Sequence, residues 1–115
     1  MRLFVYGSLL SGEVHHARLG GSRLLGEART EARYTLLDLG PYPALLDGGT
    51  TSVSGEIYEV AADVLAALDA FEGHPDEYRR VPVRMLACEA AEAYVLPRAN
   101  VPLARVIASG SWRSR

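Results

Sequence analysis

The chain has 115 residues, with 14 acidic side chains against 12 basic ones and a formal net charge of -2 at pH 7. Every basic residue is an arginine, which excludes chemistry that needs a lysine amine, such as a Schiff base or a Walker phosphate loop. The single cysteine, Cys88, cannot form an intrachain disulfide or a thiolate zinc site, so we expect a reducing, cytoplasmic environment. Because the chain has no basic tract and no apolar stretch near the roughly 20 residues that span a bilayer, we expect neither nucleic acid nor a membrane as a partner.

The first half of the chain has mainly the pattern of β-strands. Residues 2–6 form a short apolar run that stops at Gly7 and Ser8, as a buried strand does before a tight turn. A short helix is predicted over residues 11–19, capped by Ser11 and ended by two glycines. Further strands are predicted at residues 23–30, 33–39 and 51–60; in the last, Val53, Gly55 and Ile57 alternate with a polar opposite face.

Between two of these runs, Pro41 and Pro43 flank Tyr42. Proline donates no backbone hydrogen bond, so this segment is predicted to stay out of any central strand. The clearest helix spans residues 61–72, because Ala and Leu dominate it and Gly73 and Pro75 then stop it.

The second half ends in two more predicted strands, residues 78–88 and 92–96, and an irregular tail that contains Trp112, which we expect to pack on its own domain. We therefore predict one α+β domain over residues 1–115. Its small, mainly antiparallel sheet would curl, or close into a β-barrel, around one main and one short helix.

One acidic residue of the 61–72 helix, Glu72, lies on the apolar face of that helix. A wheel of about 100° per residue puts one apolar stripe on the helix: Val64, Leu65, Leu68 and Phe71. Glu72 falls inside this stripe, where burial and the negative end of the helix dipole both raise the pKa of a carboxylate. Such an acid suits general acid–base catalysis. The alternative is a frayed helix end, with Glu72 in water or paired with Arg79 or Arg80; Asp69, at the edge of the stripe, is expected to be solvated.

The second candidate site is the turn formed by Tyr6, Gly7, Ser8 and Leu9. Successive backbone N–H groups in such a turn can bind an anion, and Gly7 would allow close approach by a ligand carboxylate. Ser8 lacks the flanking glycines of a nucleophile elbow. An ordinary strand-to-helix turn is the alternative.

Metal binding is not expected from the remaining candidates. His15 and His16 are neighbours on a predicted helix and would point about 100° apart, which makes joint coordination of one ion awkward. Cys88 is expected to be a small buried side chain at a strand end.

Several short motifs follow one another along nearly the whole chain. They are Tyr6-Gly7-Ser8-Leu9, Gly12, Tyr42-Pro43-Ala44-Leu45, Val53-Ser54-Gly55-Glu56-Ile57-Tyr58, and Leu68-Asp69-Ala70-Phe71-Glu72-Gly73 with Tyr78 and Arg80. In order and spacing they resemble the γ-glutamylcyclotransferase-like (AIG2-like) family, and residues 71–75 with Tyr78 and Arg80 are most similar to its γ-glutamylamine cyclotransferase branch. One departure is His15, where family members often carry Asn.

The resemblance implies a γ-glutamylcyclotransferase-like fold and an enzyme that needs no cofactor. Such an enzyme releases 5-oxoproline when the α-amine of a γ-glutamyl amide attacks its own γ-carbonyl. The turn at residues 6–9 would hold the glutamyl α-carboxylate, and Glu72 would be the general acid and base. The further substrate-binding residues implied are Tyr42, Pro43, Tyr78 and Tyr94. The expected partner is a small γ-glutamyl substrate, and the expected state is a monomer or a weak homodimer.

Two other hypotheses remain open. In the first, the chain is a non-catalytic module that binds a γ-glutamyl group or another small acid. In the second, it is a partner-interaction domain that uses its sheet edges. The last hypothesis predicts no pocket that brings residues 6–9 near Glu72, and a Glu72 that points to solvent would favour the binding module. The cyclotransferase hypothesis requires the carboxylate of Glu72 within a small ligand's reach of the backbone amides of that turn.

Overall fold

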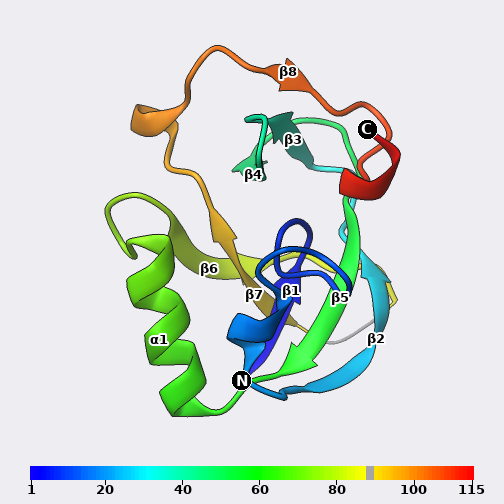
Figure 1. Ribbon diagram of the computed structural model, residues 1–115. Helices are drawn as coiled ribbons and strands as arrows, with labels where there is room; N and C mark the ends of the chain where they lie inside the picture. Colours follow the sequence, from blue (N-terminus) through cyan, green and yellow to red (C-terminus); the bar gives the residue numbers. More distant parts are fainter. Residues whose placement is uncertain (88–89) are drawn as a thin grey trace.

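The computed structural model describes residues 1–87 and 90–115, and its strands form one curled, mixed sheet (Figure 1). The strands are β1 (Arg2–Val5), β2 (Arg23–Arg29), β3 (Tyr34–Asp38), β4 (Pro43–Asp47), β5 (Ser54–Glu59), β6 (Arg79–Val83), β7 (Ala91–Val95) and β8 (Arg105–Val106). Their order is β2-β5-β1-β7-β4-β3-β8, and β6 pairs with β7. Strands β1 and β4 lie parallel to β7, whereas the other pairs are antiparallel. The predicted α+β class with a curled sheet is confirmed.

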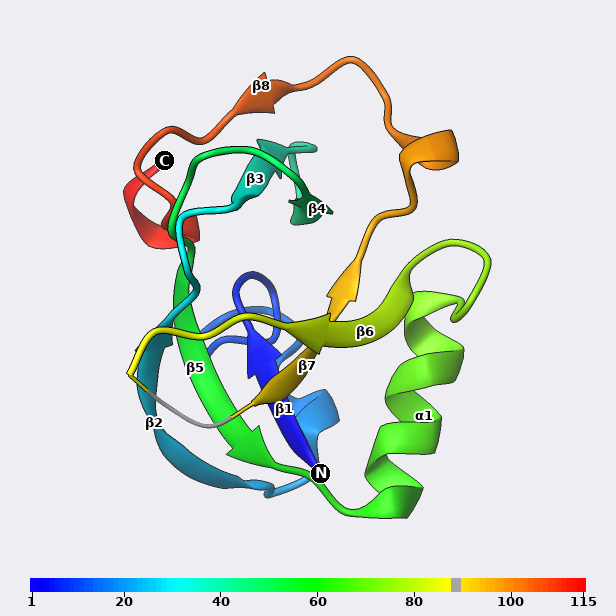
Figure 2. The ribbon, with the colours of Figure 1, turned by 180° about the vertical axis from the view of Figure 1, so that it is seen from behind.

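Helix α1 (Ala62–Glu72) stands beside β6 at one side of the sheet, as both views from front and back show (Figures 1 and 2). Its apolar stripe faces the core, where Leu68 is 1% exposed. The helix ends as predicted at Gly73, whose φ of 69° is readily adopted only by glycine. Within the described residues, no helix is long and apolar enough to cross a membrane.

The predicted helix over residues 11–19 is wrong in its first half. Only a 3-10 turn, His16–Leu19, forms there. Ser11 does not cap a helix, because its backbone N–H and its Oγ both donate to the carboxylate of Glu56, at 2.8 and 2.6 Å. Gly12, with a φ of 80°, then turns the chain away from helical geometry.

The exclusion from any central strand is confirmed for residues 40–42 but is wrong for Pro43, the first residue of β4, which lies between β7 and β3. A proline is tolerated at the first position of a strand, where its missing N–H breaks no ladder. Strand β4 has both faces covered: Leu45 belongs to the main core, while Ala44 and Leu46 belong to a smaller cluster on the other side. A strand buried on both faces shows no polar alternation, and so periodicity could not reveal it.

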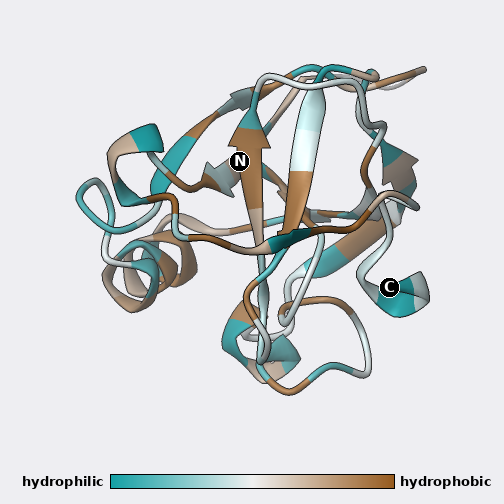
Figure 3. Ribbon diagram, turned by 90° about the horizontal axis from the view of Figure 1, so that it is seen from above, coloured by the Kyte–Doolittle hydropathy of each residue, from teal (hydrophilic) through white to brown (hydrophobic). Residues whose placement is uncertain are grey.

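The main core fills the inside of the curled sheet. Figure 3 shows long hydrophobic stretches on strands through the middle of the molecule, whereas the short turn at the C terminus is hydrophilic. Trp112, in the terminal 3-10 turn Trp112–Ser114, is 3% exposed and packs into the main core, which confirms that it covers its own chain. The expectation for Cys88 lies outside the described residues.

The hydroxyl group of Tyr6 ties three strands together at the end of β1. It donates to the backbone oxygen of Tyr94 in β7 at 2.6 Å and accepts the backbone N–H of Leu45 in β4 at 3.2 Å. The side chain is buried, and burial raises its pKa well above the ordinary value, so the hydroxyl stays protonated and can donate. The Tyr6 side chain therefore links the end of β1 to β7 and β4 at the point where the turn of residues 6–9 begins.

We predict that Tyr6→Phe lowers the free energy of unfolding by about 1–3 kcal/mol, because it leaves two buried backbone groups without their shared partner. Urea unfolding measures this change. Tyr42→Phe is the matched control, since Tyr42 is 44% exposed, and it should change stability by less than about 0.5 kcal/mol. Equal stability of the wild type and Tyr6→Phe would contradict this role.

Candidate functional site

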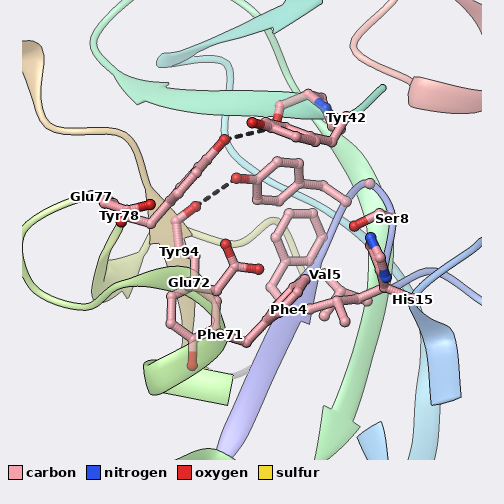
Figure 4. A pocket seen from close by; sticks show the side chains of 14 residues that line it. Phe4, Val5, Ser8, His15, Tyr42, Phe71, Glu72, Glu77, Tyr78 and Tyr94 are labelled. Atoms are coloured by element: carbon pink, nitrogen blue, oxygen red, sulfur yellow. Dashed lines mark hydrogen bonds between the residues drawn. The ribbon is translucent and has the colours of Figure 1, made fainter. Parts of the chain in front are cut away.

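A cavity of about 270 Å³ opens beside the C-terminal end of α1 (Figure 4). All nine residues predicted for the site line it: Tyr6, Gly7, Ser8, Leu9, Tyr42, Pro43, Glu72, Tyr78 and Tyr94. The fold thus joins motifs that lie far apart in the sequence, although their roles in binding and catalysis stay predictions. The partner-interaction hypothesis expected no pocket shared by residues 6–9 and Glu72, and the cavity contradicts it.

The turn after β1 is closed by its own backbone. The N–H of Leu10 donates to the oxygen of Gly7 at 3.0 Å, and the N–H of His15 donates to the oxygen of Ser8 at 2.9 Å. In the described part of the chain, the N–H groups of Gly7, Ser8 and Leu9 have no backbone or side-chain acceptor. These amides are the donors with which the turn can bind an anion.

The small size of Gly7 is required for packing, while the predicted close approach of a ligand carboxylate to Gly7 stays a prediction. A Cβ atom added to Gly7 would overlap Cγ and Cδ of Pro43. The small residue therefore lets the start of β4 pack directly on the turn, and Pro43 becomes part of the wall.

Glu56 binds Ser11, in the segment that follows the turn of residues 6–9, and the sequence did not identify it as a site residue. The alternation in residues 51–60 placed it on the polar face, but it is 5% exposed and accepts hydrogen bonds from Ser11 and from the Tyr58 hydroxyl. Although burial opposes its ionisation, the hydrogen bonds from Ser11 and Tyr58 hold its pKa below the usual value. An acid that interrupts a strand covered on both faces is the signal that could have identified it.

The carboxylate of Glu72 lines the cavity and lacks a partner. Among the described residues it forms no ion pair and no side-chain hydrogen bond. Burial raises its pKa from 4.5 to about 7; Arg18 opposes this shift, and Glu77 adds to it. Glu72 can therefore both accept and donate a proton near neutral pH.

The neighbouring acid, Asp69, has the opposite environment. It binds the guanidinium group of Arg80 through both oxygens, at 2.9 and 3.0 Å, and accepts the hydroxyl of Tyr94 at 2.7 Å. The hydrogen bond from Arg80 lowers the pKa of Asp69 despite partial burial. The expected solvation of Asp69 and the alternative pairing of Glu72 with Arg80 are both wrong, because Arg80 is held by Asp69 and Glu92. An acid at one helical turn from Glu72, with an arginine at the start of the next strand, is the sequence signal for this pair.

The hydroxyl groups of the pocket tyrosines are mostly engaged within the protein. Besides Tyr6, Tyr78 donates to the oxygen of Pro43 at 3.2 Å, and Tyr94 donates to Asp69. Burial raises the pKa of both phenols, so they are neutral. Their rings form walls of the cavity, while Tyr42 stands half exposed at its rim.

The ring of Phe71 lines the cavity next to Glu72 and contacts two basic side chains. The ring of Phe71 meets the ring of His15 edge-on, with centroids 5.1 Å apart, and the guanidinium carbon of Arg18 lies 3.8 Å from the Phe71 centroid. His15, which stands where family members often carry Asn, lines the cavity. No group of three or more His, Cys, Asp or Glu side chains in residues 1–87 and 90–115 is arranged to hold a metal ion.

The chain is similar in sequence and in fold to several known proteins. The family described as "Gamma-glutamyl cyclotransferase, AIG2-like" matches residues 3–114. A Vibrio cholerae relative with a provisional γ-glutamylcyclotransferase name is 42% identical over 98% of this chain and 96% of its own. The solution structure of YtfP from Escherichia coli is 35% identical, covers 97% of this chain and 96% of its own, and has a TM-score of 0.72. The crystal structure of an AIG2-like protein from Mus musculus is 28% identical, covers 88% of this chain and 78% of its own, and has a TM-score of 0.73.

We predict that Glu72→Gln stabilises the fold at high pH and not at low pH. The pKa of Glu72 is about 7 in the folded chain against an ordinary 4.5. The wild type therefore loses stability as the pH rises from about 4.5 to about 7, because only the unfolded chain ionises freely there, and the loss is complete above pH 7 and absent below pH 4.5. The variant should exceed the wild type by about 2–3 kcal/mol above about pH 8 and equal it near about pH 4, measured by urea unfolding.

The control for this experiment is Asp76→Asn, which neutralises an exposed acid outside the cavity. A stability difference between Glu72→Gln and the wild type that stays constant across the pH range would contradict the raised pKa of Glu72.

Proposed function

The chain belongs to the γ-glutamyl cyclotransferase, AIG2-like family, and we propose that it releases 5-oxoproline from γ-glutamyl amides in which the γ-carbonyl is bound to an amine. Family membership supports a cyclotransferase kind of function. The observation that carries the finer proposal is the Glu72 carboxylate, unpartnered and with a pKa raised to about 7, in the same cavity as the free backbone amides of residues 7–9.

The substrate supplies the nucleophile in this reaction. Its α-ammonium group first loses a proton to the ionised Glu72, because a protonated amine cannot attack a carbonyl. The freed amine attacks the γ-carbonyl carbon, and the bond to the leaving nitrogen breaks after Glu72 returns the proton to that nitrogen. The lactam nitrogen also loses its second proton, which the released amine takes up to become an ammonium group. A carboxylate with a pKa near 7 suits both steps, since it is ionised for the first and acidic enough for the second.

Positioning supplies much of the remaining acceleration. We assign the glutamyl α-carboxylate to the backbone N–H groups of Gly7, Ser8 and Leu9, which have no other acceptor in the described chain. The walls formed by Pro43 and the rings of Tyr78 and Tyr94 then hold the glutamyl chain in a bent conformation. Well-oriented intramolecular attack reaches effective molarities of about 10⁵ M or more, so neither a protein nucleophile nor a metal is needed.

The direct test is to incubate the protein with a panel of γ-glutamyl amides and to measure 5-oxoproline. We predict turnover by the wild type and a loss of about 10²–10⁴-fold in kcat for Glu72→Gln, the range of a general acid–base group. Asp63→Asn, which changes an exposed acid at the opposite end of α1, should retain the wild-type rate.

The same assay gives a pH dependence. Because Glu72 must be ionised in the free enzyme, kcat/KM should rise with pH up to about 7, and Glu72→Gln should lack this rise. If a γ-glutamyl ligand shifts the melting temperature without 5-oxoproline appearing, the chain is a binding module and the catalytic proposal fails.

The binding of the substrate α-carboxylate by residues 7–9 is tested by altering the substrate instead of the protein, so the fold is unchanged. Replacing that carboxylate with a neutral carboxamide should lower kcat/KM about 10²-fold, since each hydrogen bond to a charged group contributes about 1.5–3 kcal/mol. Equal rates for the acid and the amide would show that the turn at residues 7–9 does not bind this group.

A further inference from the structure

The cavity contains a second carboxylate to which the proposed mechanism gives no role. Glu77 lies in the loop between α1 and β6, lines the cavity and is exposed. Its backbone is fixed, because its N–H donates to the oxygen of Gly73 at 2.9 Å and its own oxygen accepts from the Asn100 side chain at 3.2 Å. Among the described residues, its carboxylate has no ion pair and no hydrogen bond.

The position of Glu77 relates it to the leaving group. In Figure 4, Glu77 lies on the side of Glu72 away from Ser8, and Tyr78 stands next to it. In the proposed function, the turn that contains Ser8 binds the glutamyl α-carboxylate, and Glu72 transfers protons to and from the reacting nitrogen atoms. With the substrate placed in this way, the leaving amine extends toward Glu77. Its electrostatic effect on Glu72, whose pKa it raises, supports this proximity.

The charge of the lining favours one class of leaving group. The lining residues include Glu72 and Glu77 but no arginine. A negative leaving group would be repelled there, whereas a positive one would be attracted by Glu77 and by the faces of Tyr42 and Tyr78. The wall opposite the turn at residues 6–9 therefore has the chemistry of a cation site.

We propose that Glu77 determines specificity by selecting γ-glutamyl amides whose leaving amine carries a second positive charge, as an aminoalkyl amide does. The inference rests on the proposed function and adds the leaving-group class to it. In the reaction the bond from the α-nitrogen to the γ-carbon forms, and the bond from the γ-carbon to the amide nitrogen breaks. Two protons pass from the first nitrogen to the second, which yields 5-oxoproline and a diamine without any co-reactant.

The test compares three substrates of similar length, the γ-glutamyl amides of diaminobutane, pentylamine and aminobutyrate, which are positive, neutral and negative at the far end. Formation of 5-oxoproline gives kcat/KM for each. We expect the positive substrate to exceed the neutral one about five- to tenfold, as an ion pair assisted by aromatic faces does, and the negative one to be the poorest.

The variants assign this preference to one side chain. Glu77→Gln should lower the ratio of positive to neutral substrate severalfold, leaving the smaller preference that the aromatic faces supply, and Glu77→Lys should favour the negative substrate, because the charge at the rim is removed or reversed. Asp76→Asn, a neighbouring exposed acid outside the cavity, should keep the wild-type ratio. A loss of folded enzyme lowers the rate with all three substrates alike and therefore cancels in the ratio.

The outcomes separate the two proposals. Turnover of all three substrates with equal kcat/KM, or a ratio of positive to neutral substrate that is the same in Glu77→Gln as in the wild type, overturns the role of Glu77 and leaves the proposed function in place. Absence of 5-oxoproline from all three substrates overturns the proposed function, and the role of Glu77 with it.

Discussion

The site depends on one constraint: the Glu72 carboxylate is partly withdrawn from water and has no ion pair or hydrogen bond among the described residues. Glu72 begins from the apolar face of α1, at the negative end of the helix dipole, and the nearest available arginine of β6 is already bound to Asp69 and Glu92. Two acids one helical turn apart thus have pKa values shifted in opposite directions by their surroundings. Such separation is how one fold produces a structural acid and a proton-transfer acid from the same chemical group.

The polar groups around Glu72 are satisfied within the protein, and this decides which groups remain free for a ligand. The hydroxyl of Tyr6 joins β7 to β4, Glu56 holds Ser11, and Tyr94 donates to Asp69. Among the described residues, the lining groups without a hydrogen bond include the carboxylates of Glu72 and Glu77, the side chains of Ser8, His15 and Tyr42, and the backbone amides of residues 7–9. A site with these groups suits a substrate that carries its own nucleophile, which is consistent with a chain that has no lysine.

Local signals predicted the parts of the fold that local physics determines. The end of α1 at Gly73 follows from the left-handed conformation that glycine adopts, and the place of Glu72 follows from its spacing to the leucines. Two errors involve partners on other elements: Ser11 binds Glu56, 45 residues away, instead of capping a helix, and Asp69 of α1 binds Arg80 of β6. Strand β4 was missed because both of its faces are buried, and Pro43 opens it. The site residues were named from their motifs, yet the engagement of the tyrosine hydroxyls required the structure.

The most direct measurement of the central claim is a titration of the Glu72 side-chain carboxyl by carbon NMR, with Glu72→Gln used to assign its signal. This observes the proton on that group itself, without substrate and without reference to the unfolded chain. A midpoint of about 7 is the result expected for this partly buried carboxylate, which has no ion pair or hydrogen bond among the described residues. A midpoint at the ordinary value of 4.5 would contradict the account, because Glu72 would then be a solvated acid at a frayed helix end.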